Sequence, residues 1–215
     1  MRGEPAVGEG RIFPFAREQV SITPFNPPAH WARIAALDFG WDHPTAAVLL
    51  AFDRDHDMLY VTQCYSARQK TPVEHCQVLR SWGQSLPWMW LHDGLQTEKG
   101  SGLALARQFR EQGLAMHHEP VRFVDGSRSV EAGILEMYTR MQNGKLKVFD
   151  HCEDWFSEFA LYHRKDSRIV KLRDDLLSAT RYAIMGLRYA RPLIPHRAKA
   201  SALTSQNKAY NPLDW

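Results

Sequence analysis

The chain has 215 residues, of which 44% are hydrophobic and 24% are charged. This length and composition predict a globular domain with a sizeable core and exclude a disordered chain. No apolar stretch reaches the roughly 18 residues of a membrane-spanning helix, and the first residues lack the apolar run of a signal peptide. The three cysteines (Cys64, Cys76 and Cys152) have no CxxC spacing. We therefore expect a reducing cytoplasm and neither a disulfide framework nor a zinc ribbon.

The net charge of +3 gives only weak support for a polyanionic partner. The distribution of charge is more informative. Between Arg164 and Lys199 ten Lys or Arg residues stand against three Asp residues. This segment is a candidate phosphate-binding surface.

Residues 1–30 are rich in Gly and Pro and show neither helical nor strand periodicity, so we interpret them as an N-terminal linker. Residues 31–190 are predicted to form one domain, and residues 191–215 a flexible C-terminal tail. The domain opens with three strand-like runs joined by short polar connections, which predicts an antiparallel meander. These runs are RIAALDFGW, TAAVLLAFD and MLYVTQCYS.

Helices and strands alternate in the rest of the domain. Thr71 and Pro72 have the residue types of a helix start, and a helix is predicted from there to Gly83. The apolar run WMWLH predicts a buried central strand ending at Asp93-Gly94. The remaining predicted elements are, in order, helix 102–114, strand 116–124, helix 129–141, strand 146–149, helix 154–162 and helix 174–190.

Four aspartates lie at the ends of predicted elements. Asp38 follows IAAL within the first strand, Asp93 ends the second apolar strand, and Asp174 and Asp175 begin the last helix. A carboxylate at a core-facing position is costly unless it is paired or bound to metal. Two strand ends and a helix start can converge, and their oxygens suit two Mg²⁺ or Mn²⁺ ions that promote phosphodiester hydrolysis.

Each aspartate also has a structural interpretation. Asp93-Gly94 is a common turn dipeptide, and Asp174 and Asp175 have the residue types of an N-cap and a first helical turn. Asp42 and His43 fit a surface loop. The other histidines near these positions (His92, His117 and His118) lack the partners of a metal motif and are interpreted as ordinary polar residues.

Five sequence blocks together resemble the C-terminal nuclease domain of tailed-phage terminase large subunits. They span about residues 8–191 and read GEGRIFPF, ALDFGWDHPTAA, LHDG with EKGSGLALA, SVEAGILEMYTRMQNGKLKVF, and EFALYHRKDSRIVKLRDDLLSATRYAIMGLR. The resemblance implies an RNase H-like α/β fold, a mixed central β-sheet flanked by α-helices. It also implies an endonuclease that cuts concatemeric viral DNA during genome packaging.

Carried over to this sequence, the metal-binding carboxylates of the family fall on Asp38, Asp93 and the pair Asp174 and Asp175. Adjacent helical residues point about 100° apart, so one of the pair is expected to ligate directly and the other to support it. Family members often have another acid a few positions into the last helix, where this chain has Ser178. That departure leaves the pair carrying more of the role.

A whole terminase also has an ATPase, whereas this sequence contains no GxxxxGK[ST] phosphate loop. We therefore expect an excised domain or fragment that is monomeric in isolation and acts on double-stranded DNA in the host cytoplasm. In the full-length protein the expected partners are the portal and the small terminase subunit.

The candidates for DNA contacts are basic residues near the acids, and we expect them to bind mainly phosphate. They are Lys99, Arg164, Lys165, Lys171 and Arg173. Glu158 is left outside the site. Two alternatives stay open: another RNase H-like nuclease such as a Holliday-junction resolvase, and a non-catalytic DNA-binding or assembly module.

Overall fold

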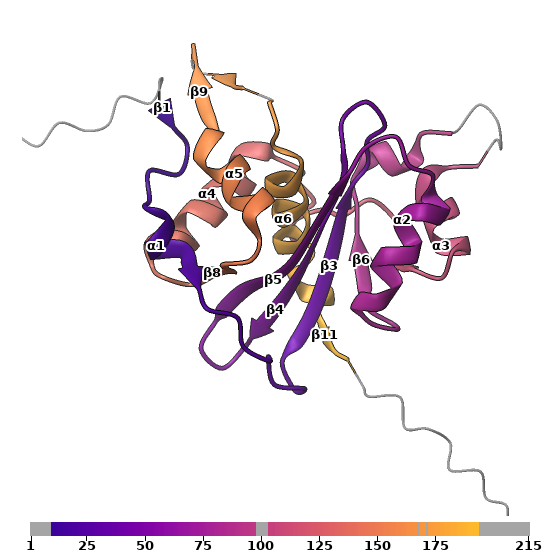
Figure 1. Cartoon of the computed structure of the whole chain (residues 1–215), viewed down its shortest axis with the longest axis horizontal. Helices are drawn as coiled ribbons and strands as arrows, with labels where there is room; N and C mark the ends of the chain where they lie inside the picture. The colour runs from indigo at the N-terminus through magenta and orange to yellow at the C-terminus, as the bar shows by residue number, and fades with distance from the viewer. Residues whose placement is uncertain (1–9, 98–102, 167, 171, 194–215) are drawn as a thin grey trace, which may run out of the picture.

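A computed structural model describes residues 10–97, 103–166, 168–170 and 172–193 of the chain (Figure 1). Its centre is an antiparallel meander of three strands, β3 (Ala32–Asp38), β4 (Thr45–Asp53) and β5 (Met58–Ala67). The predicted meander is therefore confirmed. Because β4 runs back from the end of β3, Asp38 pairs with Ala46 near the start of β4.

Further strands extend the meander on both sides into a mixed sheet in the order β2-β8-β5-β4-β3-β6-β7. On one side, β8 (Leu146–Phe149) runs parallel to β5, and β2 (Ser21–Ile22) runs parallel to β8. On the other side, β6 (Pro87–Met89) runs parallel to β3, and β7 (Ala115–Met116) runs parallel to β6. The short β11 (Arg191–Pro192) also pairs with β3.

Helices cover both faces of this sheet, so the fold has three layers (Figure 1). One face carries α4 (Val130–Gln142), α5 (Glu153–Leu161) and α6 (Asp175–Met185). The other carries α2 (Pro72–Leu79) and α3 (Leu105–Glu111). Short 3₁₀ helices span Arg80–Trp82 (η1), His92–Leu95 (η2) and Leu187–Tyr189 (η3). A mixed sheet between helices is the predicted RNase H-like α/β fold, which is confirmed.

The alternation of side chains along β3 explains the two cores. Ile34 and Ala36 pack in the core that contains α4, α5 and α6. Ala35 and Leu37 point the opposite way, into the smaller core under α2 and α3. Because both faces of the strand are buried, its sequence is apolar throughout until Asp38.

The segment before β3 differs from its interpretation as a linker. Residues 10–22 contain β1 (Gly10–Arg11), the short helix α1 (Arg17–Val20) and β2. Phe13 is fully buried, and its ring stacks 6.0 Å from that of Phe159. This part of the segment therefore packs on the domain. Elements of two to four residues are too short to produce a periodic pattern, so they could not be predicted from the sequence.

β1 also belongs to a small second sheet that was not predicted. It pairs with β9 (His163–Lys165), which pairs in turn with β10 (Arg168–Ile169). Residues 1–9 and 194–215 lie outside the described residues, so only the first residues of the predicted tail are placed.

The predicted strand 116–124 is wrong beyond Met116. The backbone N–H groups of His117 and Val121 still donate to the carbonyls of Trp88 and Trp90. Between them lies Pro120, which has no N–H group to donate, so a continuous ladder does not form. Among the described residues no helix has the length and apolar character needed to cross a membrane.

A buried hydrogen bond joins α5 to α6 and generates a prediction about stability. Trp155 Nε1 donates to Thr180 Oγ1 at 2.9 Å, and both residues are fully buried. Thr180→Val removes the acceptor and leaves the indole N–H unpaired. We expect a loss of about 1–3 kcal/mol in the free energy of unfolding, measured by urea denaturation.

The matched control is Thr139→Val, the same substitution at an exposed position of α4. It should leave the unfolding midpoint nearly unchanged. Equal effects of the two substitutions would contradict the role given to the Trp155–Thr180 bond.

Candidate active site

Asp38 is the last residue of β3, and its side chain lies on the α6 side of the sheet. The hydroxyl of Tyr182, from the third turn of α6, donates to Asp38 Oδ1 at 3.2 Å. Residues 34 and 36 face the same core, so strand alternation places the carboxylate there. The apolar pattern that makes β3 a buried strand thus delivers a charge to the rim of the core.

Asp93 lies in η2, which follows the end of β6, the strand next to β3 in the sheet. The glycine that follows it is required by close packing. A Cβ atom on Gly94 would lie 2.4 Å from Trp90 Cε3 and 2.7 Å from Phe39 Cε2. Because only glycine fits there, the Asp93 turn can rest directly against the residue that follows Asp38.

Asp174 and Asp175 stand at the N-terminus of α6, as the N-cap residue and the first helical residue. The preceding Arg173 has a left-handed backbone conformation, with φ of 53°. Ten consecutive residues, from Leu176 to Met185, are buried between the sheet and the neighbouring helices. The core therefore fixes the position of the helix start, and with it the two carboxylates.

The structure brings all four predicted aspartates together around one cavity of about 250 Å³. Side chains from β3, η2, the start of α6 and its buried face line this cavity. His43, which was assigned to a surface loop, lines it as well, whereas Asp42 is exposed. The lining includes Asp38, Asp93, Asp174, Asp175, His43, Arg173, Ser178, Arg181 and Tyr182.

The carboxylates in this cavity make each other harder to ionise. Burial, followed by the charges of Asp175 and Asp93, raises the pKa of Asp38 to about 7. Burial and the charge of Asp174 raise the pKa of Asp175. A cavity in which negative charge is both desolvated and crowded favours cations.

The donor set suits a hard divalent ion, since four carboxylates supply oxygen ligands of the kind that Mg²⁺ and Mn²⁺ prefer. Their crowding is the observation that fits a metal. Within the described residues, however, no three His, Cys, Asp or Glu side chains are close enough to form a finished metal site. The aspartates therefore share the cavity without forming a closed ligand cage.

Glu158 is closer to the site than its sequence position indicated. Its Oε2 accepts hydrogen bonds from the backbone N–H groups of Leu176 at 2.8 Å and Leu177 at 3.1 Å. Burial raises its pKa to about 8. Glu158 thus caps the first turn of α6 directly behind Asp175. The available signal was an acid on the apolar side of a predicted helix, beside Trp155 and Phe159.

Arg181 also lines the cavity, although it is not among the site residues predicted from the sequence. It is only 6% exposed, and its Nη1 has no hydrogen-bond partner. Its positive charge lowers the pKa of Asp38, against the larger effects that raise it. Gly133 of α4 provides the space, because a Cβ there would lie 2.4 Å from Arg181 Cγ. Arg181 is thus a buried cation that partly offsets the acidic cluster.

The predicted DNA-contacting residues have different surroundings. Arg173 lines the acidic cavity. Arg164 forms two hydrogen bonds with the carboxylate of Glu131, and Lys165 is exposed on β9. Lys99 and Lys171 lie outside the described residues.

The sheet order, the flanking helices and the acidic cavity at the ends of β3 and β6 define an RNase H-like nuclease domain. The family described as the terminase RNase H-like domain matches residues 35–187. The chain belongs to this family.

The most informative relatives come from one phage. The terminase large subunit of Salmonella phage P22 is 43% identical over 191 residues, which cover 88% of this chain and 38% of the relative. The chain therefore spans about two fifths of the length of the curated relatives that it matches. The solved P22 large terminase nuclease domain is 42% identical and has a TM-score of 0.81, covering 87% of this chain and 97% of that one.

More distant solved structures share the fold. The SPP1 large terminase nuclease domain, crystallised with bound Mn, has a TM-score of 0.53 at 14% identity, covering 76% of this chain and 93% of that one. The G20c large terminase nuclease with bound cobalt has a TM-score of 0.54 at 14% identity, covering 83% and 97%. Two related terminase nucleases have thus been crystallised with Mn or cobalt bound.

The raised pKa of Asp38 generates a prediction about pH. Because the folded-state pKa of about 7 lies above the ordinary value of 3.8, the unfolded chain ionises first as pH rises. The stability associated with protonated Asp38 is complete below about pH 4 and is lost as pH rises towards 7. Asp38→Asn avoids this loss. Without divalent ions, we expect it to raise the free energy of unfolding at pH 8 by on the order of 2 kcal/mol.

Thermal or urea unfolding in EDTA at pH 5 and pH 8 measures this effect, and the gain should be larger at pH 8. Asp42→Asn makes the same charge change at an exposed neighbour and should show little gain. A destabilised Asp38→Asn variant at pH 8 would contradict the electrostatic description.

Proposed function

We propose that this domain hydrolyses phosphodiester bonds of double-stranded DNA with two divalent metal ions, Mg²⁺ or Mn²⁺. The observation that carries the proposal is the convergence of Asp38, Asp93, Asp174 and Asp175 on one partly buried cavity. A buried acidic cluster costs stability, and cation binding gives a physical reason for keeping it.

Asp38, Asp93 and the Asp174–Asp175 pair would hold the ions. When bound, such ions supply an activated water and stabilise the leaving oxygen of an in-line displacement. Asp175, as the first residue of a helix capped from behind by Glu158, is the member of the pair with the more fixed backbone. We therefore assign the direct ligand to Asp175 and the supporting role to Asp174.

The other residues of the cavity position this group. Tyr182 donates to one oxygen of Asp38, and we assign the other oxygen to a metal ion. Arg173 lies where it can bind a phosphate of the substrate, because it lines both the acidic cavity and the neighbouring one. Arg164 bridges to Glu131, so we assign it to the support of the small second sheet rather than to DNA.

In its full-length context we propose that the domain cuts concatemeric phage DNA during genome packaging in the host cytoplasm. The portal and the small terminase subunit are the proposed partners of the whole protein, and the isolated domain is proposed to be a monomer.

Plasmid nicking tests the catalytic proposal. The wild-type domain should convert supercoiled plasmid to open-circle and linear forms in Mn²⁺ and should do nothing in EDTA. Asp38→Ala should lower the rate at least about a thousandfold, because a ligand that also sets the geometry of the site is lost. Asp55→Asn is the control, since Asp55 lies in the exposed β4–β5 turn at the opposite edge of the sheet.

Cutting by Asp38→Ala at the wild-type rate would refute the metal-dependent mechanism. DNA binding without cutting by the wild-type domain, in either Mg²⁺ or Mn²⁺, would instead favour the non-catalytic assembly module.

A further inference from the structure

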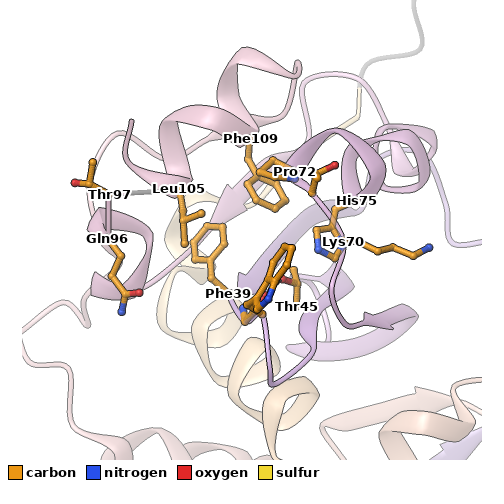
Figure 2. A pocket seen from close by; sticks show the side chains of 12 residues that line it. Phe39, Thr45, Lys70, Pro72, His75, Gln96, Thr97, Leu105 and Phe109 are labelled. Carbon is orange, nitrogen blue, oxygen red and sulfur yellow. The ribbon is translucent and has the colours of Figure 1, made fainter. Parts of the chain in front are cut away.

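A second cavity, of about 360 Å³, lies on the other face of the sheet beneath α2 and α3 (Figure 2). In Figure 2 the rings of Phe39 and Phe109 lie close together, between Pro72 and His75 on one side and Gln96 and Thr97 on the other. The ring centroids of Phe39 and Phe109 are 5.2 Å apart. Most of the surface available to a ligand in this cavity is aromatic or aliphatic.

This cavity lies at the same edge of the sheet as the four aspartates. Asp38 faces α6, whereas the next residue, Phe39, packs with the core under α2 and α3 and lines both cavities. The turn containing Asp93 is connected in the same way, because the Nε2 of Gln96 approaches Asp93 Oδ1 at 3.5 Å. Because Asp38 and Phe39 are successive residues, their Cα atoms are only about 3.8 Å apart. The acidic cavity and the aromatic cavity therefore lie next to each other at the end of β3.

The rim of the cavity carries features that favour a nucleic acid. Trp41, in the β3–β4 loop, lines the cavity and is 57% exposed. A large aromatic side chain this exposed at the mouth of a pocket is suited to a ligand with a flat face. Lys70 adds a positive charge at the same rim. Aromatic platforms beside cationic groups are how proteins hold the unpaired bases of single strands.

Several polar groups of the cavity are already engaged within the protein. Thr45 Oγ1 donates to the carbonyl of Gly40 at 2.8 Å, and Thr71 Oγ1 is part of the cap of α2. The ring of His75 stacks 5.9 Å from that of Phe109, and its Nδ1 pairs with the hydroxyl of Tyr65 at 2.9 Å. A ligand would thus be held mainly by ring faces, which accept any base, rather than by a base-specific set of hydrogen bonds.

We propose that this cavity binds an unpaired nucleobase of the DNA strand being cut, one nucleotide from the phosphate held at the aspartates. This inference rests on the proposed nuclease function and assigns a binding site to the nucleotide beside the cut. A volume of about 360 Å³ lies within the usual size range of small-ligand pockets. Because the two cavities adjoin, a DNA strand that crosses the end of β3 places a phosphate in the acidic cavity and a base in the aromatic cavity.

This arrangement has a consequence for the substrate. Extruding a base from a duplex costs free energy, and this cost is least where the base is already unpaired. Stacking on an aromatic side chain offsets part of this cost for any base. A strand with one unpaired base beside the cut should therefore be the better substrate, whereas an abasic position there removes the stacking group.

The test measures cleavage of duplexes that differ at a single position. One carries an unpaired thymine, the second carries an abasic nucleotide at that position, and the third is fully paired. In Mn²⁺ the wild-type domain should cut the thymine duplex about tenfold faster than the abasic duplex. The extra cuts should map within one nucleotide of the unpaired base on a sequencing gel.

Trp41→Ala should reduce this thymine-to-abasic ratio to between one and two, because the stacking surface at the rim of the cavity is lost. Because Trp41 is exposed, the substitution should not unfold the domain, and thermal unfolding verifies this. Leu135→Ala is the matched control, since Leu135 is 65% exposed on α4, away from the cavity. It should keep the wild-type ratio.

Equal thymine-to-abasic ratios in wild type and Trp41→Ala would overturn the base-binding proposal. That result would favour an apolar side chain of another protein segment, instead of a base, as the occupant of the cavity. Failure of the wild-type domain to cut any of the three duplexes would instead count against the nuclease function itself, so the two failures are distinguishable.

Discussion

The placement of α6 is the constraint on which the rest of the structure depends. Its first residues carry Asp174 and Asp175, and its buried face packs against β3 and β4. From the third turn, Tyr182 reaches back to Asp38. Any sliding of the helix by one turn, about 5.4 Å, would remove the acidic pair from the sheet edge and break this contact. The site therefore depends on the core for its geometry.

Electrostatics works against the same arrangement. Helix N-termini favour carboxylates, and Asp174 and Asp175 benefit from that position. Burial and mutual repulsion act in the opposite direction and raise the pKa values of Asp38 and Asp175. Glu158 adds another buried acid just behind them, and the buried Arg181 supplies a positive charge that lowers the pKa of Asp38. The metal-free domain thus stores unfavourable free energy where the proposed chemistry needs cations.

The sequence predicted the large elements and the aspartates because both depend on local patterns. An apolar run interrupted by one acid identified β3 and Asp38, and the N-terminal pair marked the start of α6. The small elements in residues 10–22 and the β9–β10 hairpin depend on pairing between distant segments, such as β1 with β9, and have no periodicity of their own. Glu158 was left outside the site, and Arg181 was not singled out, for a related reason. Their roles arise from contacts between helices, Glu158 with the first turn of α6 and Arg181 with Gly133 of α4, and the local sequence shows only that Glu158 lies on the apolar side of its helix.

The position of the acids also shapes how this domain can hold DNA. Four carboxylates at one edge repel a phosphate backbone, and the net charge of +3 for the whole chain is too small to overcome this locally. Arg173, just before α6, lines the acidic cavity and can contact a phosphate there. Arg164 instead pairs with Glu131. Under the proposed function, phosphate binding at the aspartates therefore requires that cations first neutralise them. The proposed metal binding and DNA binding would then be coupled. Contacts that do not depend on charge, such as the proposed base stacking beside Phe39, would gain importance in fixing where the DNA strand lies.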